Sequence, residues 1–233
     1  MAAPTAPRYD ILVPGSSLAL AEGFIGISTI VLIEAGGLRI VGDCGHAVTR
    51  VQLRAALARR KLAPEDIDIL FLSHLHNDHC LNADVFPKAR VLVGRDEWNY
   101  ADKPHRQDDF IPAFIKPWLS TMRLEVLEGE PEIAPGVTVL KTPGHTPGHL
   151  SLVLEGTELG RAVIAFDAIK TARELLSEEI GMEFDAEKRG VASIRAIKAL
   201  ADRIVPGHFP EFRKLANGGW SWDANQPLNL VFR

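Results

Sequence analysis

Residues 73–80, SHLHNDHC, constrain the fold more than any other part of the sequence. Three histidines and an aspartate lie within six residues, directly after IDILFLS, an apolar run typical of a buried strand. Alternate side chains of an extended chain point to the same side, so His74, His76 and Asp78 are expected to converge while His79 begins the next element. Imidazoles and carboxylates bind zinc, iron and manganese. The stretch therefore predicts a metal site at a strand end.

A purely structural role is the alternative, in which Asp78 caps a helix starting at His79. The density of the cluster argues against it, because each buried imidazole would need its own partner. Three further strand ends each carry one candidate ligand: His145 in KTPGHTPGH, Asp167 in AFDA and His208 in VPGHF. Each is weak alone, but one ion takes three or four protein ligands, so seven ligands predict two metal ions.

Strand-like and helix-like segments alternate through both halves of the sequence. Apolar runs favour strands within residues 28–45, 67–73, 89–94, 122–127, 136–142, 149–156, 161–167 and 204–208. Helical spacing appears in residues 48–62 and 187–203. Residues 95–122, punctuated by three prolines, are expected to be irregular and to form a lid or pocket wall. This alternation favours a layered α/β architecture.

Composition bounds the class of protein. The chain has 233 residues, 46% of them hydrophobic, which predicts one domain over residues 1–233. A net charge of -4 without a long basic run argues against nucleic acid as a partner. The N-terminal residues show no signal-peptide pattern, and the apolar runs are too short for a bilayer, so no membrane association is expected. Cys44 and Cys80 are too few for a disulfide framework, which favours a cytoplasmic location.

The sequence resembles the metallo-β-lactamase superfamily, whose signature His-x-His-x-Asp-His stands here at residues 74–79. The later ligands of that family match His145, Asp167 and His208 in order and spacing. The resemblance covers nearly the whole chain, from LRIVGDCG to IVPGHF. It implies a four-layer αββα sandwich with the site at one edge.

The resemblance also implies a role for each residue. The first metal ion would be held by His74, His76 and His145, the second by Asp78, His79 and His208, and Asp167 would bridge the two. Asp43 matches an aspartate that orients a ligand imidazole. The ions are expected to be zinc, with iron, manganese and cobalt as alternatives. They would supply a hydroxide at neutral pH, and Asp78 would pass a proton to the leaving group, which makes Asp78 and Asp167 the catalytic candidates.

Within the superfamily, SHLHNDHCLNADVF and APGVTVLKTPGHTPGHLSLVLEG are similar to N-acyl-homoserine lactonases. This implies hydrolysis of a small lactone or carboxylic ester. Several such enzymes carry a tyrosine three residues after the bridging aspartate, where this chain has Lys170. A lysine there would donate to a carbonyl or bind an anionic group, unless it is a solvated surface residue. Phe110 and Phe114 are candidates for the pocket wall, and His149 is expected to pack locally rather than bind metal.

Other functions remain open at this point. The same fold supports phosphodiesterases and RNA-processing nucleases, and IVPGHFPEFR also resembles a small animal member linked to RNA processing. A mononuclear iron oxygenase or a degenerate binding module fits seven intact ligands less well. A β-lactamase is not expected, because the pattern around the bridging aspartate differs. The sequence does not decide the substrate or whether the chain forms a homodimer.

Overall fold

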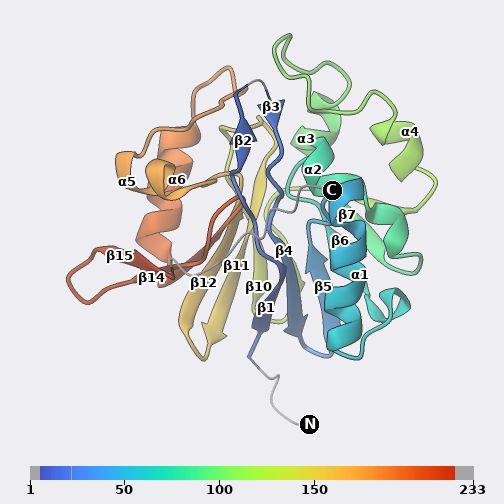
Figure 1. Cartoon of the computed structure of the whole chain (residues 1–233), viewed down its shortest axis with the longest axis horizontal. Coiled ribbons are helices and arrows are strands. Elements are labelled where there is room, and N and C mark those ends of the chain that lie inside the picture. Colours follow the sequence, from blue (N-terminus) through green and yellow to red (C-terminus); the bar gives the residue numbers. More distant parts are fainter. Residues whose placement is uncertain (1–5, 22, 224–233) are drawn as a thin grey trace.

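Two β-sheets pack face to face between helices, as Figure 1 shows for this computed structural model. The structure describes residues 6–21 and 23–223. The architecture is the four-layer αββα sandwich that the sequence resemblance implies. Among the described residues, no helix combines the length and apolar character needed to cross a bilayer.

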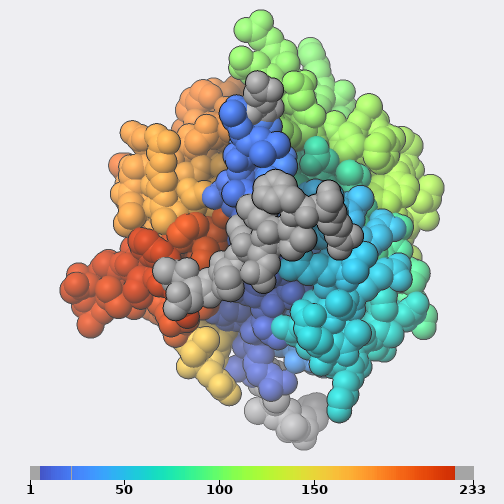
Figure 2. All heavy atoms as spheres, in the orientation of Figure 1, coloured from blue at the N-terminus to red at the C-terminus, as the bar shows by residue number. Residues whose placement is uncertain are grey.

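The first sheet is built from the first half of the chain in the order β1-β4-β5-β6-β7-β8. Strands β1, β4 and β5 are antiparallel, and β5 to β8 are parallel. Their bounds are β1 Arg8–Val13, β4 Ile30–Ala35, β5 Leu38–Gly42, β6 Ile69–Phe71, β7 Arg90–Gly94 and β8 Arg123–Leu127. A small hairpin of β2, Ala19–Leu20, and β3, Gly23–Phe24, follows β1. Figure 2 shows this hairpin, in blue, at the surface between the green and orange parts of the chain.

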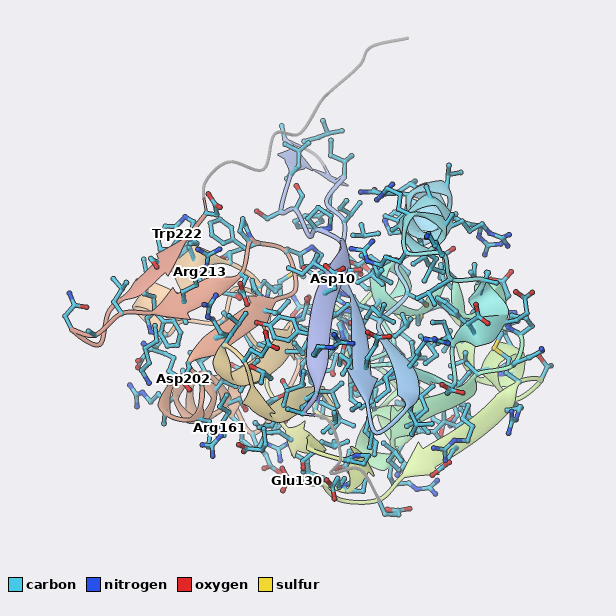
Figure 3. The ribbon with its side chains drawn as sticks, turned by 90° about the horizontal axis from the view of Figure 1, so that it is seen from below. Asp10, Glu130, Arg161, Asp202, Arg213 and Trp222 are labelled. Atoms are coloured by element: carbon cyan, nitrogen blue, oxygen red, sulfur yellow. The ribbon has the colours of Figure 1, made fainter. Side chains whose placement is uncertain are left out.

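The second sheet comes from the second half, in the order β15-β14-β13-β12-β11-β10-β9. Only β12 and β13 pair in parallel among the described strands of this sheet. The bounds are β9 Glu132–Ala134, β10 Val137–Lys141, β11 Leu150–Thr157, β12 Gly160–Phe166, β13 Arg203–Pro206, β14 Phe212–Lys214 and β15 Trp220–Trp222. Figure 3 shows β14 and β15, which carry the labelled Arg213 and Trp222, at the outer edge of this sheet.

Side-chain alternation along the strands produces the layers. In β4, Ile30 and Leu32 pack in the cluster that contains Leu53 and Leu57 of helix α1, Arg50–Arg59. Val31 and Ile33 point the other way, into the apolar layer between the sheets. Helix α6, Gly190–Leu200, covers the outer face of the second sheet with the side chains of Ile194 and Ile197. The remaining helices are α2 Asn77–Cys80, α3 Arg95–Tyr100, α4 Ile115–Leu119 and α5 Ala172–Ser177.

Two local expectations were wrong. Residues 95–122 are not irregular throughout, because they contain α3 and α4. The acidic residues Asp96 and Glu97 in the first turn of α3 suit a helix N-terminus. Helix α2 also begins earlier than expected, at Asn77, so Asp78 lies in its first turn instead of in an extended segment.

Strand ends bring the candidate ligands to one edge of the sandwich. Strands β5 and β6 are parallel and end one residue before Asp43 and two residues before Ser73. Strands β12 and β13 are parallel and end one residue before Asp167 and Gly207. The backbone is left-handed at Asp43 (φ 54°) and at Phe166 (φ 47°), although neither is glycine. Such conformations cost free energy and are concentrated at functional sites. The chain therefore turns sharply at the end of β5, which Asp43 follows, and at the end of β12, which Asp167 follows.

Candidate metal centre

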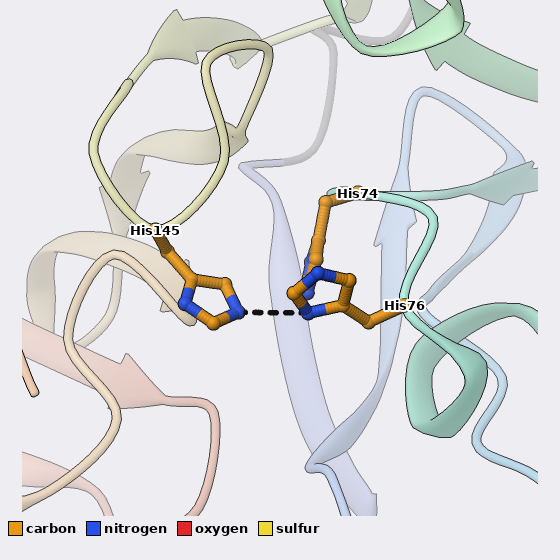
Figure 4. A group of neighbouring side chains, drawn as sticks. All are labelled: His74, His76 and His145. Carbon is orange, nitrogen blue, oxygen red and sulfur yellow. Dashed lines mark hydrogen bonds between the residues drawn. The ribbon is translucent and has the colours of Figure 1, made fainter. Parts of the chain in front are cut away.

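One group of ring nitrogens is formed by His74, His76 and His145, whose side chains converge in Figure 4. Nitrogen atoms of the three rings lie within 4.8 Å of one another, and His145 Nε2 is 2.9 Å from His76 Nδ1. The first two histidines follow β6 of the first sheet, and His145 lies in the loop between β10 and β11 of the second. The group therefore spans both sheets.

A second group is formed by Asp78, His79 and His208. Asp78 Oδ2 lies 3.3 Å from His208 Nε2 and 3.5 Å from His79 Nε2. Helix α2 supplies the first two side chains, and the loop after β13 supplies the third. This group also joins the two sheets.

Asp167 lies between the two groups. Its Oδ1 is 3.3 Å from His79 Nε2 and 3.4 Å from His208 Nε2, and its Oδ2 is 3.3 Å from His145 Nε2. One carboxylate thus faces both groups with different oxygens. A Cβ atom at Gly207 would lie 1.9 Å from Asp167 Oδ1, which explains the glycine before His208.

The chemistry of the donors fits a pair of divalent cations. His74 Nε2, His79 Nε2 and Asp167 Oδ1 are buried and have no hydrogen-bond partner among the described residues. Leaving buried polar atoms unsatisfied costs free energy, whereas coordination of a cation would satisfy them. The five imidazoles and one carboxylate of the two groups, with Asp167 between them, are a ligand set for two ions of zinc, iron, manganese or cobalt.

The outer nitrogen of each ring is held by the protein. The partners are Ser73 Oγ for His74, Asp108 for His76, Asp43 for His79, the Met182 carbonyl for His145 and the Ile27 carbonyl for His208. Asp43 Oδ2 lies 2.6 Å from His79 Nδ1, and both oxygens of Asp43 accept hydrogen bonds from Ser73. Such contacts fix the ring orientation and tautomer of metal ligands. The structure places Asp43 behind the rings, where the resemblance implies an orienting residue.

Burial and charge set the protonation states. Burial lowers the pKa of His74 and of His145 well below the usual range, which keeps both rings neutral. For Asp167, burial acts to raise the pKa, but His208 and His79 outweigh it and lower the pKa well below its usual range. For His79, burial acts to lower the pKa, but three neighbouring carboxylates raise it well above the usual value. His74 and His145 thus offer neutral imidazoles and Asp167 a charged carboxylate, whereas a cation that binds His79 would displace the proton that the carboxylates favour.

Two buried carboxylates near the site were not singled out in the sequence. Glu97 on α3 accepts hydrogen bonds from Leu75 N at 2.9 Å and from Thr146 Oγ1 at 2.7 Å. Leu75 lies between His74 and His76, and Thr146 follows His145, so Glu97 contacts both loops that carry the first group. Asp108, in the segment expected to be irregular, lies against His76. The acidic first turn of α3 is a sequence signal for the helix. No local pattern predicts that Glu97 contacts Leu75 and Thr146 or that Asp108 contacts His76.

A cavity of about 540 Å³ opens over the two groups. Phe110, Lys170 and His46 are among the residues that line it. Lys170 is not a solvated surface residue, because only 13% of its side chain is exposed. The expectation for Phe114 was wrong: its side chain is absent from the described lining of the cavity, is 55% exposed and packs edge-on against Trp118. Phe114 precedes α4, which turns its own apolar side chains into the core and leaves Phe114 outside.

His149 lies directly before β11. It is buried, and its Nδ1 lies 2.9 Å from Thr142 Oγ1. Cys44 and Cys80 are buried free thiols beside the second group. Both serve as packing residues of the first-sheet core.

A four-layer αββα sandwich with two His/Asp groups at one edge defines a class of metal-dependent hydrolases. The profile of the metallo-beta-lactamase superfamily matches residues 23–208, and the chain belongs to this superfamily. It is 30% identical over 229 residues to metallo-beta-lactamase domain-containing protein 1 of Xenopus laevis, covering 92% of this chain and 89% of that protein.

Lactonases are also among the relatives. An N-acyl homoserine lactonase of Bacillus sp is 32% identical over 150 residues, covering 64% of this chain and 57% of the lactonase. The match therefore spans less than two thirds of the lactonase. The crystal structure of a quorum-quenching N-acyl homoserine lactone lactonase superimposes with a TM-score of 0.63 at 25% identity, covering 84% of each chain.

Proposed function

We propose that the protein hydrolyses a lactone or another carboxylic ester, with an N-acyl-homoserine-lactone-like substrate favoured and with two zinc ions held by the two groups. The observation that carries the proposal is the position of Asp167, whose two oxygens face different groups at the floor of an open cavity. The similarity to lactonases supports the choice of bond.

Two metal ions held there would supply a hydroxide at neutral pH and polarise a carbonyl oxygen. The protein's own residues do the rest. Asp78 lines the cavity with 23% of its side chain exposed, which brings its carboxylate within reach of a substrate. We assign to Asp78 the transfer of a proton to the leaving oxygen. Asp167 holds the two groups at a fixed separation.

Lys170 is proposed to contact the substrate carbonyl. Its Nζ lies 2.8 Å from Glu174 Oε1, and Glu174 is itself buried and accepts a hydrogen bond from Gly181 N at 2.8 Å. The ion pair neutralises the charge of Lys170 but leaves N–H groups of the ammonium for another acceptor. Lys170 is therefore better suited to donate to a neutral carbonyl than to bind an anionic group. This favours a neutral ester over a carboxylate or phosphate substrate.

Apolar side chains on one wall of the cavity suit an acyl chain. Leu18, Phe24, Phe110 and Met182 line it, and the rings of Phe24 and Phe110 meet edge-on at a centroid distance of 6.3 Å. Ligand cavities of this size combine an apolar wall with few polar groups that fix orientation. The polar groups here are Lys170 and the metal-binding residues.

The test combines metal analysis with a turnover panel on one purified sample. The panel contains N-acyl homoserine lactones, aryl esters and bis-aryl phosphodiesters. About two metal ions per chain and lactone turnover are expected. Phosphodiester turnover without lactone turnover would overturn the proposal in favour of the nuclease alternative, and about one iron per chain without hydrolysis would point to oxygen chemistry.

Variants test the residue roles. Asp78→Asn is expected to abolish most turnover. Lys170→Met is expected to lower kcat/KM by roughly 100-fold if Lys170 donates to the oxygen that gains charge. Phe114→Ala is the control, because Phe114 lies in the same segment as Phe110 but outside the cavity lining. A Lys170→Met variant with the kinetics of the parent would refute the role of Lys170.

A further inference from the structure

The outer nitrogen of His76 is held by a side chain from a distant loop. His76 Nε2 lies 3.1 Å from Asp108, whose side chain has no exposed surface. The other ring nitrogen, Nδ1, faces His145 in the first group. A ring that donates Nε2–H to a carboxylate keeps the Nδ1 lone pair free for a cation. Asp108 thus selects the form of His76 that can bind metal.

The same carboxylate also organises its own loop, residues 104–110, here named the Asp108 loop. Tyr100 Oη donates to Asp108 Oδ2 at 2.7 Å, and Phe110 N donates to Asp108 Oδ1 at 3.1 Å. The Phe110 carbonyl in turn accepts a hydrogen bond from Asn77 N at 3.0 Å. Asn77 is the first residue of α2 and directly follows His76. The loop is therefore fastened to the ring of His76 and to the backbone of the next residue, Asn77.

Phe110, which is bound to Asp108 through its backbone, also lines the cavity. Its ring lies 5.4 Å from the His76 ring, between centroids, and lines the apolar wall. One buried carboxylate thus supports both a member of the first group and a wall residue. A change in how firmly His76 is held must change how firmly Phe110 is held, because both bonds end on Asp108.

We propose that Asp108 is a positioning residue that couples occupancy of the first group to the order of the Asp108 loop. A cation on Nδ1 makes the opposite N–H of an imidazole a stronger donor, so the charge-assisted bond to Asp108 tightens when metal binds. The tightened carboxylate holds the backbone of Phe110, and metal loading orders the cavity wall. The coupling does not depend on the substrate; its consequence for acyl-chain selectivity rests on the proposed function.

The experiment measures backbone hydrogen exchange and zinc affinity in the parent and in Asp108→Asn. Zinc is expected to slow exchange across residues 104–110 of the parent at least several-fold, and this protection is expected to disappear in Asp108→Asn. Zinc affinity, measured by chelator competition, is expected to fall about 10-fold to 100-fold in the variant. Equal zinc protection of the loop in parent and variant would overturn the coupling. Unchanged zinc affinity would overturn the positioning role.

Two further variants separate this role from a general loss of structure. Tyr100→Phe removes one donor to Asp108 while keeping the ring, and it is expected to weaken the zinc-dependent protection partly. Phe110→Ala keeps the backbone bond to Asp108, and it is expected to leave zinc affinity unchanged while raising KM for long-chain lactones. If the parent hydrolyses no lactone, the proposed function fails, but exchange and zinc affinity still decide the assignment of Asp108.

Discussion

Replacing Gly148 with alanine is expected to damage the first group from outside the ligand set. A Cβ atom at Gly148 would lie 1.9 Å from Glu97 N and 2.3 Å from Glu97 Cα. Carbon contacts are favourable near 3.5 Å, so the loop that contains Gly148, between β10 and β11, and helix α3 must separate by about 1.5 Å. The bonds from Leu75 N and Thr146 Oγ1 to Glu97, now 2.9 and 2.7 Å, would then both break.

The magnitude follows from these losses. Overpacking costs about 1 to 3 kcal/mol, and each buried donor left without a partner costs a similar amount. Even the low ends of these ranges give roughly 3 kcal/mol, which lowers Tm by about 6 to 12 °C for a chain of this size. Zinc affinity should fall as well, because Leu75 and Thr146 neighbour His76 and His145.

The assay is thermal unfolding of metal-free and zinc-loaded protein, followed by chelator competition. Gly23→Ala is the matched control, because a Cβ atom there would meet nothing within 4 Å. The control should unfold at the temperature of the parent. A Gly148→Ala variant with the Tm and zinc affinity of the parent would show that Glu97 does not clamp the two ligand loops together.

Three further predictions concern metal and pH. Asp43→Asn is expected to weaken the affinity for one metal ion about 10-fold to 100-fold, because Asp43 orients His79; chelator competition that shows two unaltered affinities would contradict this. Zinc at 1,000 times its Kd is expected to stabilise metal-free protein by about 4 kcal/mol for each ion bound, seen as a higher Tm that chelation reverses. Burial lowers the pKa of His149 to about 3. On acidification, His149 of the unfolded chain is protonated near pH 6.5, whereas His149 of the folded chain stays neutral. The parent should therefore lose about 2 kcal/mol more stability than His149→Gln between pH 7 and pH 5, measured by urea unfolding, and equal losses would count against it.

Local patterns were sufficient to find the candidate ligands. His74, His76 and His79 crowd one strand end, and Asp167 ends an apolar strand, so each was visible without knowledge of the fold. The structure brings all seven predicted ligands together. Most of the long strands and the two longest helices were also predictable, because their apolar spacing extends over enough residues, but β1, Arg8–Val13, was not predicted.

Contacts between distant segments were not predictable. Glu97 and Thr146 are 49 residues apart, and His76 and Asp108 are 32 apart, so only the packed sandwich brings them together. Helix α5 has six residues, too few for helical spacing to be recognised. Phe110 and Phe114 have similar sequence surroundings, yet one lines the cavity and the other faces solvent, because α4 starts immediately after Phe114.

Each metal-binding group takes members from both sheets, which has a consequence for biosynthesis. His76 and His145 come from opposite halves of the chain, as do His79 and His208. Neither half of the chain alone can supply all the ligands of either group. During synthesis, the second group is therefore complete only after residue 208 has been made and the two sheets have packed together. Because metal affinity becomes folding free energy, the ions would act as late cross-links that trap the assembled sandwich. Metal uptake during translation would thus report the completion of the fold.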